Sequence, residues 1–301
     1  MNLTMKYPNF LIIGVQKAGT TSIYNYLGQH PQVYMSPIKE TNFLEKDWEK
    51  VGKEQSLYNS NGIDTWEKYC QLFAGAKDEI ALGEASPNYL FHYKSSVERI
   101  LKYVPEAKLI AILRNPIERA YSDYLMHIRD EIGEQLSLKA EIELRPRSSF
   151  LLKKGFYSTQ LQYYFEHFDK SQIKIYLYDD LKANPVKLMQ DLYKFIGVDN
   201  SFYPDMSEKV QTAQIPKSRL VNKLLRKQNP VRSFVAKNLK LFLPEAQRQK
   251  LRSQLIKLNS DGKDKAKLNQ EERKILQDLY QEEIVSLQEL IGRDLSSWLK
   301  T

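Results

Sequence analysis

The chain has 301 residues, of which 42% are hydrophobic and 27% charged, and its formal net charge is +8 at pH 7. This composition is typical of a globular protein and excludes an intrinsically disordered chain, and the length suits one α/β domain with a single core. The positive charge favours an anionic partner, which includes nucleic acid, an anionic membrane surface and a polyanionic cofactor or substrate.

The sequence contains few residues or segments that bear on localisation or redox state. The single cysteine, Cys70, cannot form an intramolecular disulfide, and we interpret it as a buried apolar residue. The first ten residues do not resemble a secretion signal, and no apolar run approaches the roughly 18 residues of a membrane helix. We therefore expect a soluble, cytoplasmic protein without a membrane span. The sequence does not indicate an oligomeric state.

Strands and helices alternate along the first two thirds of the chain. Apolar runs predict strands at 10–14, 80–83, 108–113 and 173–177. Helices are predicted from Thr20 to before Pro31, from Pro116 onward with Asn115 as N-cap and Glu118 completing a capping box, and over 184–196. This alternation predicts an α/β fold, a three-layer parallel sheet flanked by helices.

The C-terminal third has a different character. Beyond about residue 211 the segments are basic and helical, and a long helix is predicted over 269–290. The stretch "NSDGKDKAKLNQEE" is typical of a solvated connection. We predict one domain over 1–301, with a core at about 8–200 and the helical C-terminal region, about 211–301, packed on it.

The first strand leads into the loop "GVQKAGTTS". Gly14 and Gly19 have the spacing of a phosphate loop, in which Lys and Ser/Thr follow the second glycine. Here Thr20 follows instead, and Lys17 lies inside the loop. A glycine loop at a helix N-terminus presents N–H groups and a positive dipole end, which together bind an anion. The alternative is a tight turn with a solvent-facing lysine.

A second motif, "RNPIERAYSDY", follows the buried strand at 108–113. Arg114 leaves the carboxyl end of that strand, where open α/β sheets bind ligands, and Ser122 lies two turns into the next helix. Arginine binds phosphate with a forked pair of hydrogen bonds, and a serine hydroxyl adds another. The alternative is an ion pair between Arg114 and Glu118.

Together the two motifs resemble the sulfotransferases that use 3′-phosphoadenosine 5′-phosphosulfate (PAPS). In that family a "K-x-G-T-T-S" loop binds the 5′-phosphosulfate and an "R-N-P…R-x-x-S" element binds the 3′-phosphate. Further segments occur in the order seen in bacterial sulfotransferases related to the heparan-sulfate enzymes: "SPIKETNFL", "GEASPNYL", "KGFYSTQLQYYFEHF", "IYLYDDLKANP", "IPKSRL" and "LIGRDLSSWL".

The resemblance implies in-line, metal-independent transfer of a sulfonyl group from PAPS to a hydroxyl acceptor, with release of PAP, by a P-loop-like nucleotide-binding core. Lys17 would stabilise charge on the leaving phosphate oxygen and so replace magnesium. Arg114 and Ser122 would bind the 3′-phosphate. The other implied cofactor contacts are Ala18, Gly19, Thr20, Thr21 and Ser22 in the loop, and Lys217, Ser218 and Arg219 in a late basic loop. The alternative for this late loop is a solvated linker.

The acceptor hydroxyl needs a general base. Glu40 in "KETNFL" matches the carboxylate that serves as base in the heparan-sulfate-type enzymes, and the alternative is a solvated pair of Lys39 and Glu40. Those enzymes carry a histidine two places after this glutamate. They also carry a lysine directly after a second glutamate, the one that corresponds to Glu84. This chain has Asn42 and Ala85 instead, which argues against assuming a glycosaminoglycan acceptor.

Other residues are assigned smaller roles. Glu84 orients Lys17 or Glu40, or is a polar residue at the rim of the sheet, and His92 is the reserve base. Lys39 and Tyr157 are predicted substrate contacts. The acceptor is a carbohydrate, a lipid-like alcohol or a small alcohol, and the basic charge favours an anionic one.

Parts of the sequence are also compatible with two other functions. A magnesium-dependent phosphotransferase (kinase) would use Asp179 and Asp180 in "IYLYDDL" as metal ligands. A nucleic-acid-binding protein would use the basic C-terminal helices, but aromatic residues are not interleaved with the basic ones as base-stacking platforms would require. The four histidines lack metal-ligand spacing, so no metal is expected.

Overall fold

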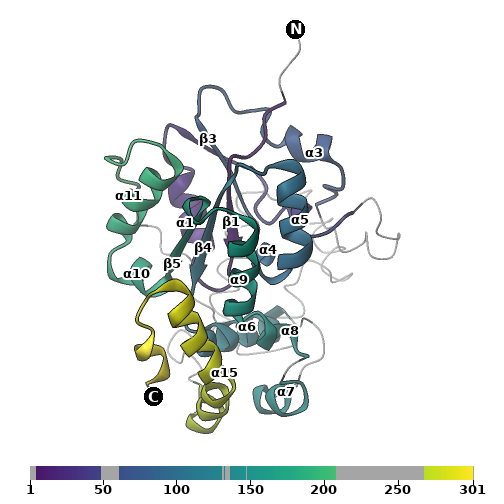
Figure 1. Cartoon of the computed structure of the whole chain (residues 1–301), viewed down its shortest axis with the longest axis vertical. Helices are drawn as coiled ribbons and strands as arrows, with labels where there is room; N and C mark the ends of the chain where they lie inside the picture. Colours follow the sequence, from purple (N-terminus) through teal and green to yellow (C-terminus); the bar gives the residue numbers. More distant parts are fainter. Residues whose placement is uncertain are drawn as a thin grey trace, which may run out of the picture.

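The computed structural model describes residues 5–48, 61–130, 132, 136–146, 148–207 and 268–300. In these residues five parallel strands form one sheet in the order β2-β3-β1-β4-β5 (Figure 1). The strands are β1 (Phe10–Gly14), β2 (Val33–Met35), β3 (Ala81–Ala85), β4 (Lys108–Leu113) and β5 (Ile173–Leu177). The predicted α/β parallel sheet is therefore confirmed.

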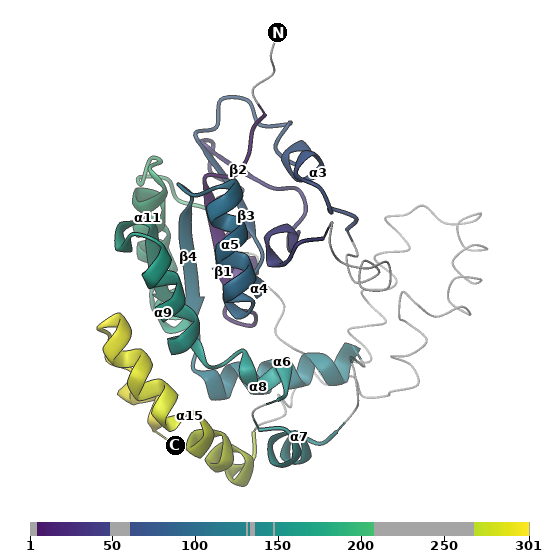
Figure 2. The ribbon, with the colours of Figure 1, turned by 45° about the vertical axis from the view of Figure 1, so that its right-hand side comes forward.

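Helices flank this sheet and continue beyond its carboxyl edge. They are α1 (Thr20–Leu27), α3 (Trp66–Gln71), α4 (Asn88–Phe91), α5 (Tyr93–Tyr103), α6 (Pro116–Asp130), α7 (Leu138–Leu144), α8 (Phe150–Lys153), α9 (Tyr157–His167), α10 (Tyr178–Ala183), α11 (Pro185–Ile196) and α15 (Gln270–Ile291). Short 3₁₀ turns are η1 (Phe43–Glu45), η2 (Lys170–Gln172) and η3 (Ser296–Leu299). Figure 2 shows α6, α7, α8 and α15 together at the end of the molecule to which β4 points. No helix in the described part of the chain is long and apolar enough to span a membrane.

Three strands have the predicted bounds, and the strand predicted at 80–83 is displaced. Ile80 is 56% exposed and precedes the strand, whereas Glu84 and Ala85 continue it in register with Leu11 and Ile12. Sequence reasoning ended the strand early because a carboxylate is rarely buried. It missed β2 altogether, since three residues carry too little periodicity to detect.

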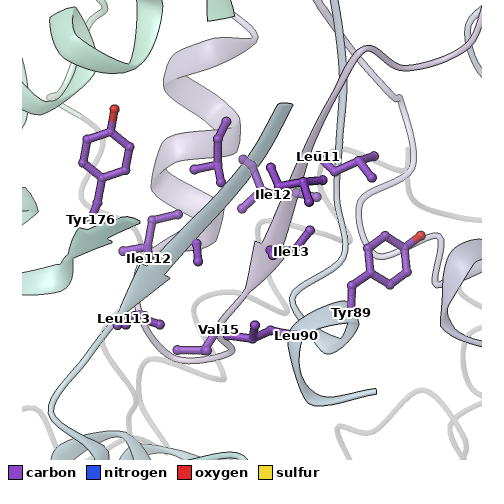
Figure 3. Close-up of a cluster of buried hydrophobic side chains, with 14 of the residues drawn as sticks. Leu11, Ile12, Ile13, Val15, Tyr89, Leu90, Ile112, Leu113 and Tyr176 are labelled. Atoms are coloured by element: carbon purple, nitrogen blue, oxygen red, sulfur yellow. The ribbon is translucent and has the colours of Figure 1, made fainter. Parts of the chain in front are cut away.

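The start of the loop is packed tightly against α4. All five residues of β1 are buried, and a Cβ added to Gly14 would lie 2.8 Å from Leu90 Cβ. Figure 3 shows Leu90 next to Val15 at the end of β1. The Val15 amide donates to the Ile112 carbonyl over 2.9 Å, so the first residue of the loop is still held by β4.

The two predicted helix starts at Asn115 and Asn269 are confirmed. The Asn115 side chain accepts from the Ile117 amide over 2.9 Å, and the Asn269 side chain accepts from the Glu272 amide over 2.7 Å. The capping box is wrong, because Glu118 accepts from Arg273 of α15 over 2.5 Å. A tertiary ion pair thus replaces the local hydrogen bond. Helix α15 packs against α6 and α9, while the basic segments at 208–267 lie outside the described residues.

Candidate active site

The loops after the strands converge because all five strands are parallel. The loop at 15–19 follows β1, the segment 36–42 follows β2, and residues 86–92 follow β3. Arg114 follows β4, and Tyr178 follows β5. The carboxyl edge of a parallel sheet is where α/β proteins bind ligands, so the predicted site residues meet at the expected edge.

The phosphate-loop segment, residues 15–19, ends at Gly19, which has a φ of 87°. The positive φ favours glycine, and a Cβ at this position would also lie 2.7 Å from the end of the Leu181 side chain and 3.2 Å from the Tyr178 ring. No side chain caps α1, and its first turn contains no acidic residue. The N–H groups at this helix end are therefore available to an anion.

Lys17 faces α6 from inside the loop. Its φ is 70°, a value that non-glycine residues rarely adopt, and its Nζ lies 3.6 Å from the Met126 sulfur. Burial lowers the pKa of the Lys17 amine, and the Asp123 carboxylate is the largest opposing influence. The side chain is half-buried, which rules out the alternative of a turn with a solvent-facing lysine.

Arg114 lies against the same loop. Its guanidinium donates to the Lys17 carbonyl oxygen over 2.8 Å and lies 4.9 Å from the centre of the Tyr178 ring. The alternative of an ion pair between Arg114 and Glu118 does not occur among the described residues, where Glu118 pairs with Arg273. Tyr157, predicted to contact the substrate, is fully buried and donates to the Arg114 carbonyl oxygen over 2.9 Å. Ser122 is half-buried one helical turn before Met126, on the face of α6 that meets Lys17.

Glu40 lies in the segment after β2. It has a φ of 61°, and its amide donates to the Ala85 carbonyl over 2.8 Å. Its carboxylate is 39% exposed and forms an ion pair of 2.6 Å with Lys39. The ion pair of Lys39 and Glu40, which was the alternative to a general base, is thus present. The strained backbone and the bond to Ala85 nevertheless hold Glu40 at the edge of the sheet.

Glu84 is fully buried in a cluster of hydroxyl groups. One carboxyl oxygen accepts from Thr41 over 2.6 Å and from Ser86 over 3.1 Å, and Tyr69 and Tyr89 also face the carboxyl. Burial raises the pKa of Glu84. Its other oxygen has no hydrogen-bond partner among the described residues. Glu84 is linked to the predicted base through two neighbours: Thr41, which adjoins Glu40, and Ala85, whose carbonyl accepts from the Glu40 amide.

His92 follows α4 at the same edge. Its Nε2 lies 3.3 Å from a Glu45 carboxyl oxygen. Burial lowers the pKa of His92 to about 4, with Lys154 and Lys46 adding to the effect. Burial also raises the pKa of Glu45. His92 is therefore neutral at neutral pH, although its low pKa makes the ring a weak base.

The residues of the phosphotransferase alternative are engaged elsewhere. Asp179 accepts from the Trp298 indole over 2.9 Å and pairs with Lys182 over 2.7 Å, and Asp180 pairs with Arg293 over 3.0 Å. Within the described ranges, no group of three or more His, Cys, Asp or Glu side chains has the arrangement of a metal site. Cys70 is buried, as predicted. The predicted contacts Lys217, Ser218 and Arg219 lie outside the described residues.

Sequence reasoning missed three residues at the site. Tyr178 stacks on Arg114, and Lys154 donates to the Gln16 side chain over 2.5 Å. Asp123 is fully buried and pairs with Arg119 over 2.9 Å. Lys154 is the first residue of the "KGFYSTQ" segment and Asp123 follows Ser122 directly within "RNPIERAYSDY", so membership of a recognised motif was the available signal.

A glycine loop and an arginine at the carboxyl edge of a parallel sheet define an anion-binding α/β protein of the P-loop-like class. A sequence profile described as "Sulfotransferase family" matches residues 8–202. The chain belongs to the sulfotransferase family. The resemblance found from the sequence motifs is thereby confirmed.

Known relatives agree with this assignment. The bifunctional heparan sulfate N-deacetylase/N-sulfotransferase 1 of Xenopus laevis is 30% identical over 208 residues, which are 65% of this chain and 23% of that protein. Enzyme 2 of the same name from Homo sapiens is 31% identical over 209 residues, 64% of this chain and 22% of that protein. The chain therefore matches less than a quarter of either relative's length. A sulfotransferase structure from Alicyclobacillus acidocaldarius is 28% identical, with a TM-score of 0.69, over 98% of this chain and 100% of that one.

Proposed function

We propose that this sulfotransferase uses PAPS as donor and transfers the sulfonyl group in line to a hydroxyl of its acceptor. The contact of 2.8 Å between Arg114 and the Lys17 carbonyl carries the proposal, because it brings both predicted phosphate contacts to one place. PAPS supplies the sulfonyl group and a phosphate leaving group.

The donor set fits a ligand with two phosphate ends. The uncapped amino end of α1 offers N–H groups, and the hydroxyls of Thr20, Thr21 and Ser22 stand in its first turn, which suits the 5′-phosphosulfate. Arg114 and Ser122 supply a guanidinium and a hydroxyl for the 3′-phosphate. Lys17 lies in the loop beside the 5′-phosphosulfate site and stabilises charge on the phosphate oxygen that leaves the sulfonyl group.

Glu40 is the proposed general base. Its position at the carboxyl edge, fixed by the bond to Ala85, supports this role, and Glu84 positions it through Thr41. His92 is the second choice, since its lowered pKa leaves the ring neutral. Lys39, paired with Glu40, is a proposed acceptor contact. We infer a carbohydrate or another alcohol as acceptor.

We further infer that the core and the C-terminal helix form one domain. The Glu283 carboxylate of α15 accepts from the Ser158 amide over 2.7 Å and from its hydroxyl over 2.6 Å. Together with the pair of Arg273 and Glu118, this ties α15 to α9 and α6. A basic nucleic-acid-binding role has no support from these contacts.

Thermal shift tests the donor and its independence from metal. PAP without magnesium should raise the Tm in proportion to ligand binding, whereas ATP with magnesium should not. Stabilisation by ATP with magnesium but not by PAP would contradict the proposal. To find the acceptor, the protein is incubated with radiolabelled PAPS and an extract of its source cell, and the labelled product is identified.

A further inference from the structure

Lys154 reaches the phosphate-loop segment from the end of α8. Its Nζ donates to the Gln16 side-chain oxygen over 2.5 Å, and Gln16 immediately precedes Lys17. The same ammonium lies 5.9 Å from the centre of the Phe91 ring. A second lysine is thus held at the loop by a contact between residues 138 positions apart.

The charge on Lys154 is incompletely neutralised. Among the described residues its polar contact is the neutral Gln16 amide, and no carboxylate forms an ion pair with it. Burial lowers the pKa of Lys154, and Asp123 is the largest opposing influence. A partly buried ammonium without a carboxylate partner is unfavourable unless an anion completes its surroundings.

The charge on Lys17, the residue after Gln16, also lacks a carboxylate partner among the described residues. Its ammonium contacts only the Met126 sulfur in the described part of the structure. Asp123 faces both lysines, but it is already paired with Arg119 over 2.9 Å. Two ammonium groups therefore share a carboxylate that is bound elsewhere, which leaves net positive charge at the loop.

Lys154 also faces the acceptor side of the site. Glu40 and Glu45 both act on its charge, and Lys154 in turn lowers the pKa of His92. The same ammonium bonds to the phosphate-loop segment at Gln16 and lies over the ring of Phe91, the residue before His92. Lys154 thus contacts both the loop proposed to bind the donor and the segment that carries the reserve base.

We propose that Lys154 binds the oxygens of the donor's sulfonyl group, on the side opposite the leaving phosphate oxygen that Lys17 serves. This assignment rests on the proposed use of PAPS. PAP lacks the sulfonyl group, so Lys154 should distinguish the two nucleotides while leaving the phosphate contacts unchanged.

Calorimetric titration with PAPS and with PAP, in the absence of an acceptor, tests this assignment. Lys154→Met should weaken PAPS binding about 10-fold or more, as expected for loss of a charge-assisted hydrogen bond, and leave PAP affinity within about 2-fold. Lys154→Arg keeps the cation and should restore most of the PAPS affinity. Lys153→Met, an exposed neighbour, is the matched control and should bind both nucleotides like the unmodified protein.

The outcomes separate this inference from the proposed function. Equal weakening of PAP and PAPS in Lys154→Met, or no weakening of either, would overturn the sulfonyl contact and leave PAPS as donor. Failure of the unmodified protein to bind either nucleotide would overturn both. If Lys154→Met does not fold, Lys154→Gln and Lys154→Arg are titrated, and an unchanged ratio of PAPS to PAP affinity in the glutamine variant overturns the inference.

Discussion

The Arg114 guanidinium donates a hydrogen bond to the Lys17 carbonyl oxygen over 2.8 Å. Lys17 has a φ of 70°, so the end of β4 supports a loop residue in a conformation that costs free energy. The two proposed phosphate contacts are therefore coupled. A change at Arg114 affects both the 3′-phosphate site and the geometry of the loop.

Arg114→Ala should reduce PAP affinity about 10- to 100-fold, because charge-assisted hydrogen bonds to phosphate are lost. AMP lacks the 3′-phosphate, so its affinity should differ less between the variant and the unmodified protein than the affinity for PAP does. Titration of both nucleotides measures this preference. Lys182→Ala is the control, since Lys182 also lies over the Tyr178 ring, at 5.2 Å, but is exposed. An Arg114→Ala protein with full preference for PAP over AMP would refute the role.

Lys17→Met should lower turnover about 10²- to 10³-fold, the usual cost of removing one preorganised group that stabilises transition-state charge. PAP affinity should change much less, because Gly19 and the end of α1 still bind the phosphate. Single-turnover transfer from labelled PAPS to the identified acceptor, with PAP titration alongside, separates the two effects. A variant that loses PAP affinity but keeps its turnover rate would contradict the assignment.

Glu40→Gln should reduce turnover about 10²- to 10⁴-fold through loss of the general base. The shape of the side chain and the backbone bond to Ala85 are retained, so PAP should bind normally. Glu98→Gln, on the exposed face of α5, is the matched control. Near-normal turnover of Glu40→Gln would direct the search for the base to His92.

Arg119→Met should lower the free energy of unfolding by about 3–5 kcal/mol, because it leaves the buried Asp123 carboxylate without its ion-pair partner. Urea unfolding measures the loss. Lys68→Met breaks an exposed pair with Asp64 and should cost about 1 kcal/mol or less. Similar losses in the two variants would show that Asp123 is neutralised by other groups.

His92 should make stability fall with acidification. Its pKa is about 4 in the folded protein and about 6.5 in the unfolded chain, so the unfolded state binds more protons between these values. The contribution of His92 is complete above about pH 6.5 and is lost as the pH falls toward 4. The side chain is 35% exposed, so solvent screening reduces the effect.

Comparison with His92→Gln isolates this contribution, since Glu45 and other carboxyl groups titrate in both proteins. Urea unfolding at about pH 7 and about pH 5 should show a larger loss of stability in the unmodified protein than in the variant. Parallel pH dependence of the two proteins would mean that His92 titrates near its ordinary value.

Local patterns predicted most of the sheet and the phosphate-loop segment. The uniformly apolar runs of β1 and β4, the caps at Asn115 and Asn269 and the glycine spacing are properties of short stretches, which the sequence displays directly. Glu84 was misread as the residue after its strand because its burial depends on hydroxyl partners as distant as Thr41. No local pattern reveals such compensation.

The sequence by itself determined the α/β class, the family and the two motifs proposed to bind phosphate, because each depends on local patterns and on their order along the chain. Only the tertiary structure decided that Arg114 supports Lys17, that Asp123 faces two lysines and that Lys154 reaches Gln16. These contacts join residues as many as 138 positions apart. They arise from strand order and helix packing, which bring side chains together through the burial of the whole core rather than through neighbours along the chain.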